Sequence, residues 1–131
     1  MNRFIRHFRW VMVVSGVLTL TMVQAAIAPQ AALHSIFGDS LEGPLAEIVV
    51  RNWGALIALV GLMLIYGAFR PEARKLVLVV AGLSKIIFIA LILTFGRQYW
   101  EHVGVAAVVD TLMVLLFVVY LLVSGHSAAK T

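Results

Sequence analysis

The chain has 131 residues, of which 63% are hydrophobic and only 12% are charged, and it contains no cysteine. A soluble domain is about 45–50% apolar and about 25% charged, so a water-soluble fold is excluded, as are disulfides and thiolate metal or redox sites. The formal net charge is +4, but the basic residues flank apolar segments, which favours membrane orientation over nucleic-acid binding.

Four apolar segments follow one another along the chain, at approximately 10–28, 48–69, 76–95 and 103–123. A spanning helix needs about 20 apolar residues, and none of the segments alternates polar and apolar residues as a membrane β-strand does. We therefore expect an all-α integral membrane four-helix bundle that forms a single domain over residues 1–131, with the lipid bilayer as its surroundings.

The first segment has a second interpretation. Its basic start, its apolar stretch and the small residues around Val23-Gln-Ala25 resemble a secretory signal with a cleavage site. Cleavage would leave three helices and an outside N-terminus. Pro29 directly after Ala28 is unfavourable for processing there, and the apolar run is long for a signal. We therefore favour an uncleaved spanning helix.

The connections contain residues that end or begin helices. The first, 29–47, holds two glycines and two prolines, with a short interfacial turn expected at Leu33-His-Ser-Ile-Phe37. The second, Arg70-Pro-Glu-Ala-Arg-Lys75, is a tight basic hairpin in which Pro71 suits the first turn of the next helix. The third runs from 96 to 104 and offers aromatic interfacial anchors.

The basic residues predict the orientation. They gather before the first segment, in the second connection and in the tail, as Arg3, Arg6, Arg9, Arg70, Arg74, Lys75 and Lys130. The first connection has no Lys or Arg, and the third has only Arg97. By the positive-inside rule, both termini are expected on the cytoplasmic side.

Lys85 is the most informative residue, because it lies near the middle of the third segment. An ammonium at that depth costs about 2.5–3.5 kcal/mol on insertion scales, so it must face protein, water or a counter-charge. Asp110 lies close to the middle of the fourth segment. The two segments are consecutive and antiparallel, and small residues accompany each charge. We therefore expect Lys85 and Asp110 to point toward each other.

This expected pair has two interpretations. It could be a buried switch or relay, serving as a proton path, a substrate anchor or a docking charge. It could instead be a structural ion pair that fixes helix register, or Lys85 could extend to the headgroups. The structural pair is favoured, because it requires nothing further from the sequence.

The start of the second segment is also polar. Glu47 and Arg51 are spaced (i, i+4) and are expected to pair along one helix face. Glu47, Arg51 and Asn52 could form a polar cluster that closes the outer mouth of a cavity in the bundle, although anchoring at the membrane boundary is the simpler interpretation. Further along, three glycines (54, 61 and 67) form a small-residue stripe that predicts helix packing, internal or between protomers.

The chain shows no motif for chemistry of its own. The four histidines lie outside the cores of the spanning segments, and no nucleophile–base set, phosphate loop or metal-ligand motif occurs. We therefore expect no catalytic residues, no metal site and no cofactor, and no binding to nucleic acid. A membrane enzyme subunit would need its cofactor from a partner.

One stretch supports a family resemblance. It runs from Arg51-Asn-Trp-Gly-Ala-Leu-Ile-Ala-Leu-Val-Gly61 through Arg70-Pro71 to Ser84-Lys85. With the four helices and the basic hairpin, this stretch resembles the DoxX-like group of small membrane proteins. The resemblance implies a bacterial inner-membrane protein, an accessory subunit linked to respiratory or quinone chemistry. No residue role is carried over.

The expected function is therefore that of an accessory or interaction protein of the inner membrane, with a membrane-protein partner or a second copy of itself. The alternative is a transporter or binding protein for a lipid-soluble small molecule or a proton. That alternative would use Lys85 and Asp110.

Overall fold

The computed structural model describes residues 2–129, and Lys130, one of the residues used for orientation, lies outside them. The helices in chain order are α1 Asn2–Leu20, α2 Val23–Ile27, α3 Pro29–Phe37, α4 Pro44–Phe69, α5 Arg74–Phe95 and α6 Trp100–Ala129. Short 3-10 turns, Pro71–Ala73 and Arg97–Tyr99, precede α5 and α6.

The predicted all-α class is confirmed, and the four predicted segments correspond to stretches that have the length and apolar character of membrane spans. Four stretches are long and apolar enough to cross a membrane: Arg3–Ile27, Pro44–Phe69, Pro71–Phe95 and Arg97–Gly125. Large apolar side chains are exposed along all of the long helices, as expected for surfaces in contact with lipid. Two predicted starts were too late, because α4 begins at Pro44 rather than at residue 48 and α6 at Trp100 rather than at residue 103.

The first span differs from the continuous helix predicted over 10–28. It begins at Asn2 and is interrupted after Leu20 by a turn at residues 21–22. Thr21 Oγ1 donates to the carbonyl of Leu18 over 2.5 Å, and Met22 N donates to the carbonyl of Thr19 in an i−3 pattern. Threonine hydroxyls that bond to the preceding turn bend helices, so the break has a local cause.

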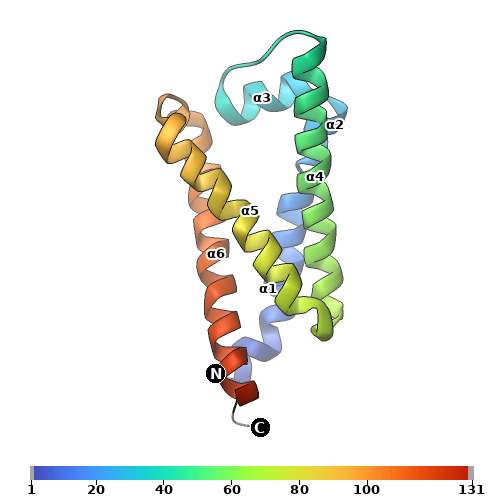
Figure 1. Cartoon of the computed structure of the whole chain (residues 1–131), viewed down its shortest axis with the longest axis vertical. Coiled ribbons are helices and arrows are strands. Elements are labelled where there is room, and N and C mark those ends of the chain that lie inside the picture. Colours follow the sequence, from blue (N-terminus) through green and yellow to red (C-terminus); the bar gives the residue numbers. More distant parts are fainter. Residues whose placement is uncertain (1, 130–131) are drawn as a thin grey trace.

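α3 replaces the interfacial turn expected at 33–37. Ala28 precedes Pro29, and its φ of −134° and ψ of 75° end α2, because proline excludes the helical region for the residue before it. α3 ends at Gly38, whose φ of 73° is the left-handed conformation typical of a helix C-cap. Figure 1 shows α3 lying across the end of the bundle that is remote from both termini.

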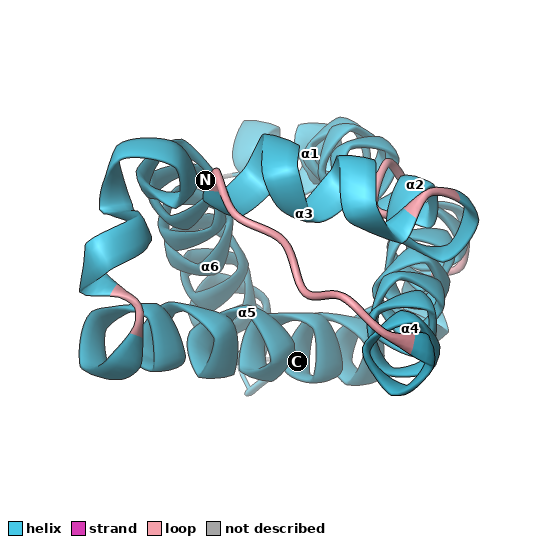
Figure 2. Cartoon of the chain, turned by 90° about the horizontal axis from the view of Figure 1, so that it is seen from above, coloured by secondary structure: helices cyan, strands magenta, loops and turns pink. Residues whose placement is uncertain are grey.

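The four long helices form a ring. α1 packs on α4, α4 on α5, α5 on α6, and α6 on α1, while α2 packs on α4 and α3 on α6. α1 and α5 therefore occupy opposite corners, as seen along the bundle in Figure 2. The start of α1, the end of α6 and the α4–α5 connection lie at the same end (Figure 1).

The two ends of the ring are filled differently. A buried cluster occupies the end near the termini and takes side chains from α1, α4, α5 and α6: Phe8, Met12, Leu64, Ala68, Val77, Leu78, Ala81, Met113, Phe117 and Tyr120. A smaller cluster (Ala25, Ala32, Leu33 and Val50) joins α2 and α3 to α4 at the other end.

The predicted glycine stripe on α4 is an internal packing surface. Gly54 contacts α2, Gly61 contacts α1, and Gly67 contacts Met12. At Gly61 the approach is to backbone atoms, because an added Cβ would lie 2.6 Å from Leu20 N and 2.7 Å from Gly16 O. Backbone atoms cannot move aside without separating α1 from α4.

We therefore expect Gly61→Ala to lower the free energy of unfolding by about 1–3 kcal/mol, the usual cost of overpacking. Unfolding in mixed micelles measures this. The matched control is Gly82→Ala on α5, which is also buried but where an added Cβ would meet nothing within 4 Å. The control should be neutral or stabilising by about 0.5–1 kcal/mol, since alanine is the better helix former. Equal effects at the two positions would contradict the packing argument.

Candidate functional site

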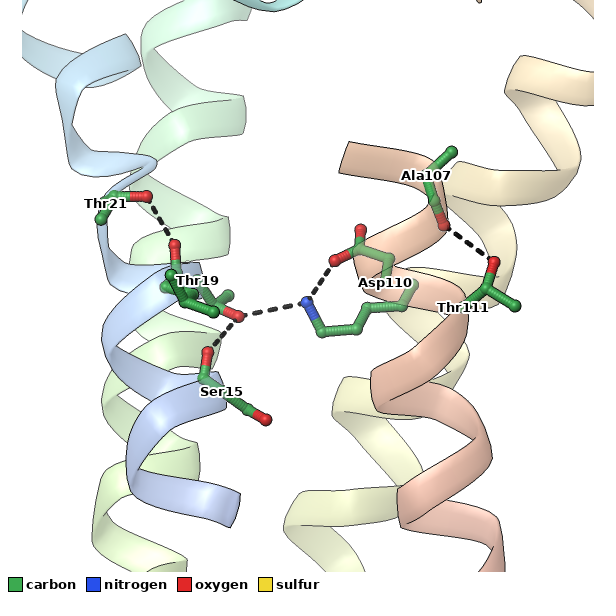
Figure 3. A network of polar contacts seen from close by, with 8 residues as sticks. Ser15, Thr19, Thr21, Ala107, Asp110 and Thr111 are labelled. Carbon is green, nitrogen blue, oxygen red and sulfur yellow. Dashed lines mark hydrogen bonds and ion pairs between the residues drawn. The ribbon is translucent and has the colours of Figure 1, made fainter. Parts of the chain in front are cut away.

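The structure brings Lys85 and Asp110 together. Lys85 Nζ on α5 donates to Asp110 Oδ1 on α6 over 3.0 Å, and it also donates to Thr19 Oγ1 on α1 over 3.1 Å (Figure 3). Lys85 therefore reaches across the ring and connects three helices. The contact with Asp110 follows the sequence expectation, whereas the contact with Thr19 does not.

Thr19 is prepared for this contact by the end of α1. Its hydroxyl donates to the carbonyl of Ser15 over 2.7 Å, which leaves the oxygen lone pairs for the ammonium of Lys85. Thr19 also lies in the last turn of α1, where the partial negative charge of the helix C-terminus stabilises a nearby cation. The break in the first span therefore contributes to holding Lys85 in the membrane.

The two charged side chains differ in burial. The side chain of Lys85 is 8% exposed and that of Asp110 is 21% exposed. The Lys85 side chain is therefore almost fully covered by protein. The Asp110 side chain is more exposed, and it lines the cavity described next. Each buried charge is compensated by the other at 3.0 Å, so removing either one would leave an unpaired charge.

A cavity of about 330 Å³ adjoins the pair. Residues from each of the helices α1 to α6 line it. Its polar lining consists of Thr19, Thr21, Gln24, Ser84, Lys85 and Asp110. The rest of the lining is apolar and includes Met22, Ile57, Val60, Phe88 and Met113. The cavity thus offers one polar region beside a larger apolar one.

The expected outer-mouth cluster is not part of this cavity. Glu47, Arg51 and Asn52 are absent from its lining, to which Trp53 contributes instead. Arg51 does not pair with Glu47; its Nη1 donates to the carbonyls of Ala26 and Ile27 over 2.6 and 3.2 Å. The i, i+4 spacing indicated a pair along α4, but the carbonyls at the end of α2 lack intrahelical partners and take the guanidinium of Arg51 instead. The expected Glu47–Arg51 pair is therefore not formed, and a role of this cluster at an outer mouth stays a prediction.

Arg74 has a structural role that was not predicted from the sequence, where it served only to predict the orientation in the membrane. Arg74 is buried and donates to the carbonyls of Gly67 and Ala68 over 3.0 and 2.7 Å, at the end of α4. Its guanidinium lies 5.9 Å from the ring centroid of Tyr120, and its Nη1 lies 3.3 Å from the Tyr120 hydroxyl. Arg74 thus joins α4, α5 and α6 at the end near the termini.

No cluster of three or more His, Cys, Asp or Glu side chains that could hold a metal ion occurs within residues 2–129. The arrangement can bind and orient a small molecule through hydrogen bonds and a charge pair. Comparison of the chain with protein-family models, with curated proteins and with solved structures finds no match.

Proposed function

We propose that this protein is an integral membrane binding protein for a lipid-soluble small molecule, which it holds in the cavity beside Lys85 and Asp110. The observation that carries the proposal is the cavity itself, with a buried ion pair in its wall. Ligand sites in proteins are commonly about 300–1,000 Å³, mostly apolar, with a few convergent polar groups. Both the size and the lining of this cavity fit that description.

The cavity favours binding over the accessory role that the sequence suggested. A protein that serves only to dock on a partner requires a complementary outer surface and a well-packed core. A cavity among its helices has no part in that role. Charged residues inside a membrane protein are costly and are typical of binding sites and transport paths. Sites of this kind in transporters also lie near the bilayer midplane and beside interrupted helices, as does Lys85 beside the α1–α2 break.

The proposed location is the inner membrane of a bacterium, in keeping with the DoxX-like resemblance, with both termini in the cytoplasm. Arg3, Arg6 and Arg9 lie in the first half of α1, at the end of the bundle that also holds Arg70 in the α4–α5 connection and Lys75 in the first turn of α5. Basic residues concentrated at one end of a bundle favour the cytoplasmic side for that end.

This orientation predicts a labelling pattern. Since the chain has no cysteine, the single exposed substitutions Ser40→Cys and Glu72→Cys report the two ends separately. In intact spheroplasts a membrane-impermeant maleimide should modify Ser40→Cys but not Glu72→Cys. Opening the membrane should make both reactive. The reverse pattern would place the termini outside.

The binding function is tested by thermal unfolding of the purified protein in the presence of a solvent extract of its native membranes. A ligand at about 100 times its Kd adds about 2.7 kcal/mol of stability, so the melting temperature should rise. Ala106→Phe fills the cavity and should abolish the rise, because Ala106 lines it. Val105→Phe is the matched control, since Val105 is 73% exposed on the same helix and outside the lining. An equal rise in all three proteins would contradict binding in the cavity.

A further inference from the structure

We propose that the ligand is an uncharged, lipid-soluble alcohol or phenol that reaches the cavity sideways from the bilayer. Its hydroxyl would close a hydrogen-bonded ring with Lys85 and Asp110. This inference rests on the proposed function and adds the chemical class of the ligand and its route.

The charge of the cavity favours an uncharged ligand. Lys85 and Asp110 are the only ionisable residues in its lining, and they neutralise each other at 3.0 Å. A ligand with a charged head group would bring an unpaired charge into a region of low dielectric, which is strongly unfavourable. The pair therefore selects against organic anions and cations.

The hydrogen bonds of the pair favour a hydroxyl in particular. An ammonium has three N–H donors, and within residues 2–129 Nζ of Lys85 uses two of them, for Asp110 and Thr19. Asp110 Oδ2 receives no hydrogen bond from the described residues, and it is not sealed from open space. In Figure 3 only one of the two Asp110 oxygens carries a dashed line. The pair thus offers one donor and one acceptor side by side.

A hydroxyl group satisfies both of these atoms at once, because it accepts from Nζ and donates to Oδ2. A ketone could only accept, so Oδ2 would lose access to water without gaining a donor. An amine in its cationic form could only donate, and a carboxylate would face the like charge of Asp110. Among these four head groups, the hydroxyl of an alcohol or phenol leaves the fewest polar atoms unsatisfied.

The exposed part of the lining indicates the route. Among the lining residues, Leu18, Thr21 and Gln24 on the α1–α2 side and Val109 on α6 are exposed. The lining residues of α4 and α5 are buried or half-buried. These exposed lining residues favour a mouth between α1–α2 and α6. Because these residues belong to spanning segments, this mouth faces lipid.

The ligand class is tested with four bromine-tagged ten-carbon compounds that differ only in the head group: alcohol, ketone, carboxylate and ammonium. Trp53 lines the cavity, and the protein has two other tryptophans. Trp10→Phe with Trp100→Phe leaves Trp53 as the only tryptophan emitter, and bromine quenches it. In nanodiscs we expect the alcohol to give saturable quenching with a half-saturating concentration about tenfold lower than that of the ketone. This difference corresponds to one additional hydrogen bond. Neither charged compound should give a saturable component.

The cavity variants distinguish failure of the ligand class from failure of the binding function itself. Adding Ala106→Phe should remove the saturable component, whereas adding Val105→Phe should leave it. Saturable binding in which the ketone or carboxylate equals or exceeds the alcohol would overturn the ligand class and leave the binding function intact. If none of the four compounds gives saturable quenching, the ligand class fails, and a thermal shift with the membrane extract shows whether the binding function fails with it.

The route has its own matched variants. Val109→Phe narrows the proposed mouth and should slow the onset of quenching several-fold. Val108→Phe, at a neighbouring position that is 60% exposed and outside the lining, should not. Equal onset rates would overturn access between α1–α2 and α6.

Discussion

Lys85→Ala should lower the free energy of unfolding by about 3–5 kcal/mol, the largest effect expected of any single substitution in this chain. The change leaves the Asp110 carboxylate in the membrane without its partner at 3.0 Å. It also removes the bond that ties Thr19 on α1 to α5. Unfolding in mixed micelles measures the loss, and Lys75→Ala is the control, because Lys75 is an exposed lysine on the same helix.

The charge swap distinguishes an ion pair from a general intolerance of substitution. Asp110→Ala alone should be severe for the same reason as Lys85→Ala. The double variant Lys85→Asp, Asp110→Lys restores opposite charges on α5 and α6 and should recover part of the lost stability. Recovery should be incomplete, since Thr19 is positioned to accept from a lysine on α5. A double variant no more stable than the worse single variant would refute the pairing.

Arg74→Ala should cost about 2–4 kcal/mol. Hydrogen bonds from a charged donor contribute about 1.5–3 kcal/mol each, and Arg74 makes two to the end of α4 in a buried setting. Its removal would leave those carbonyls unsatisfied and take away the cation that lies over Tyr120. Arg74→Lys should give an intermediate loss, because an ammonium cannot reproduce the planar fork of a guanidinium.

The control for this prediction is Arg70→Ala. Arg70 belongs to the same connection, but its contact with Glu72 is 3.9 Å long and both side chains are well exposed. Exposed pairs contribute about 0–1 kcal/mol, so the change should be small. If Arg74→Ala were no more destabilising than Arg70→Ala, the role assigned to Arg74 in joining three helices would be incorrect.

The contact between Lys85 and Asp110 could be anticipated because only two facts were needed: the high cost of a charge in lipid and the adjacency of consecutive antiparallel helices. Both are properties of the sequence. The participation of Thr19 could not be anticipated in the same way. It depends on α1 ending at Leu20, through hydroxyl bonds within its last turns, and on α1 lying diagonally opposite α5 in the ring.

The roles of Arg51 and Arg74 escaped prediction for a related reason. Each donates to carbonyls at the end of another helix, Arg51 to α2 and Arg74 to α4. Such acceptors exist only where a helix stops, and both helix ends and neighbours are set by tertiary structure. The short i, i+4 spacing of Arg51 and Glu47 therefore gave a misleading indication. The cavity could not be predicted from the sequence either, because residues from all six helices line it.

The ion pair both stabilises the bundle and lines the proposed binding cavity, and these two roles require different experiments. Lys85 and Asp110 hold the bundle together, so variants that break the pair lose folded protein and say little about binding. Ala106→Phe changes the volume of the cavity and retains both charged side chains. Comparison with Val105→Phe separates occupancy of the cavity from the general cost of a large residue on α6.

Whether the chain carries a small molecule in its cavity can be measured by native mass spectrometry of protein extracted in mild detergent at its natural expression level. We expect the wild-type chain and Val105→Phe to carry a bound small molecule, and Ala106→Phe to lack it. A chain that carries no small molecule and instead co-purifies with defined subunits would contradict the binding function and support an accessory role.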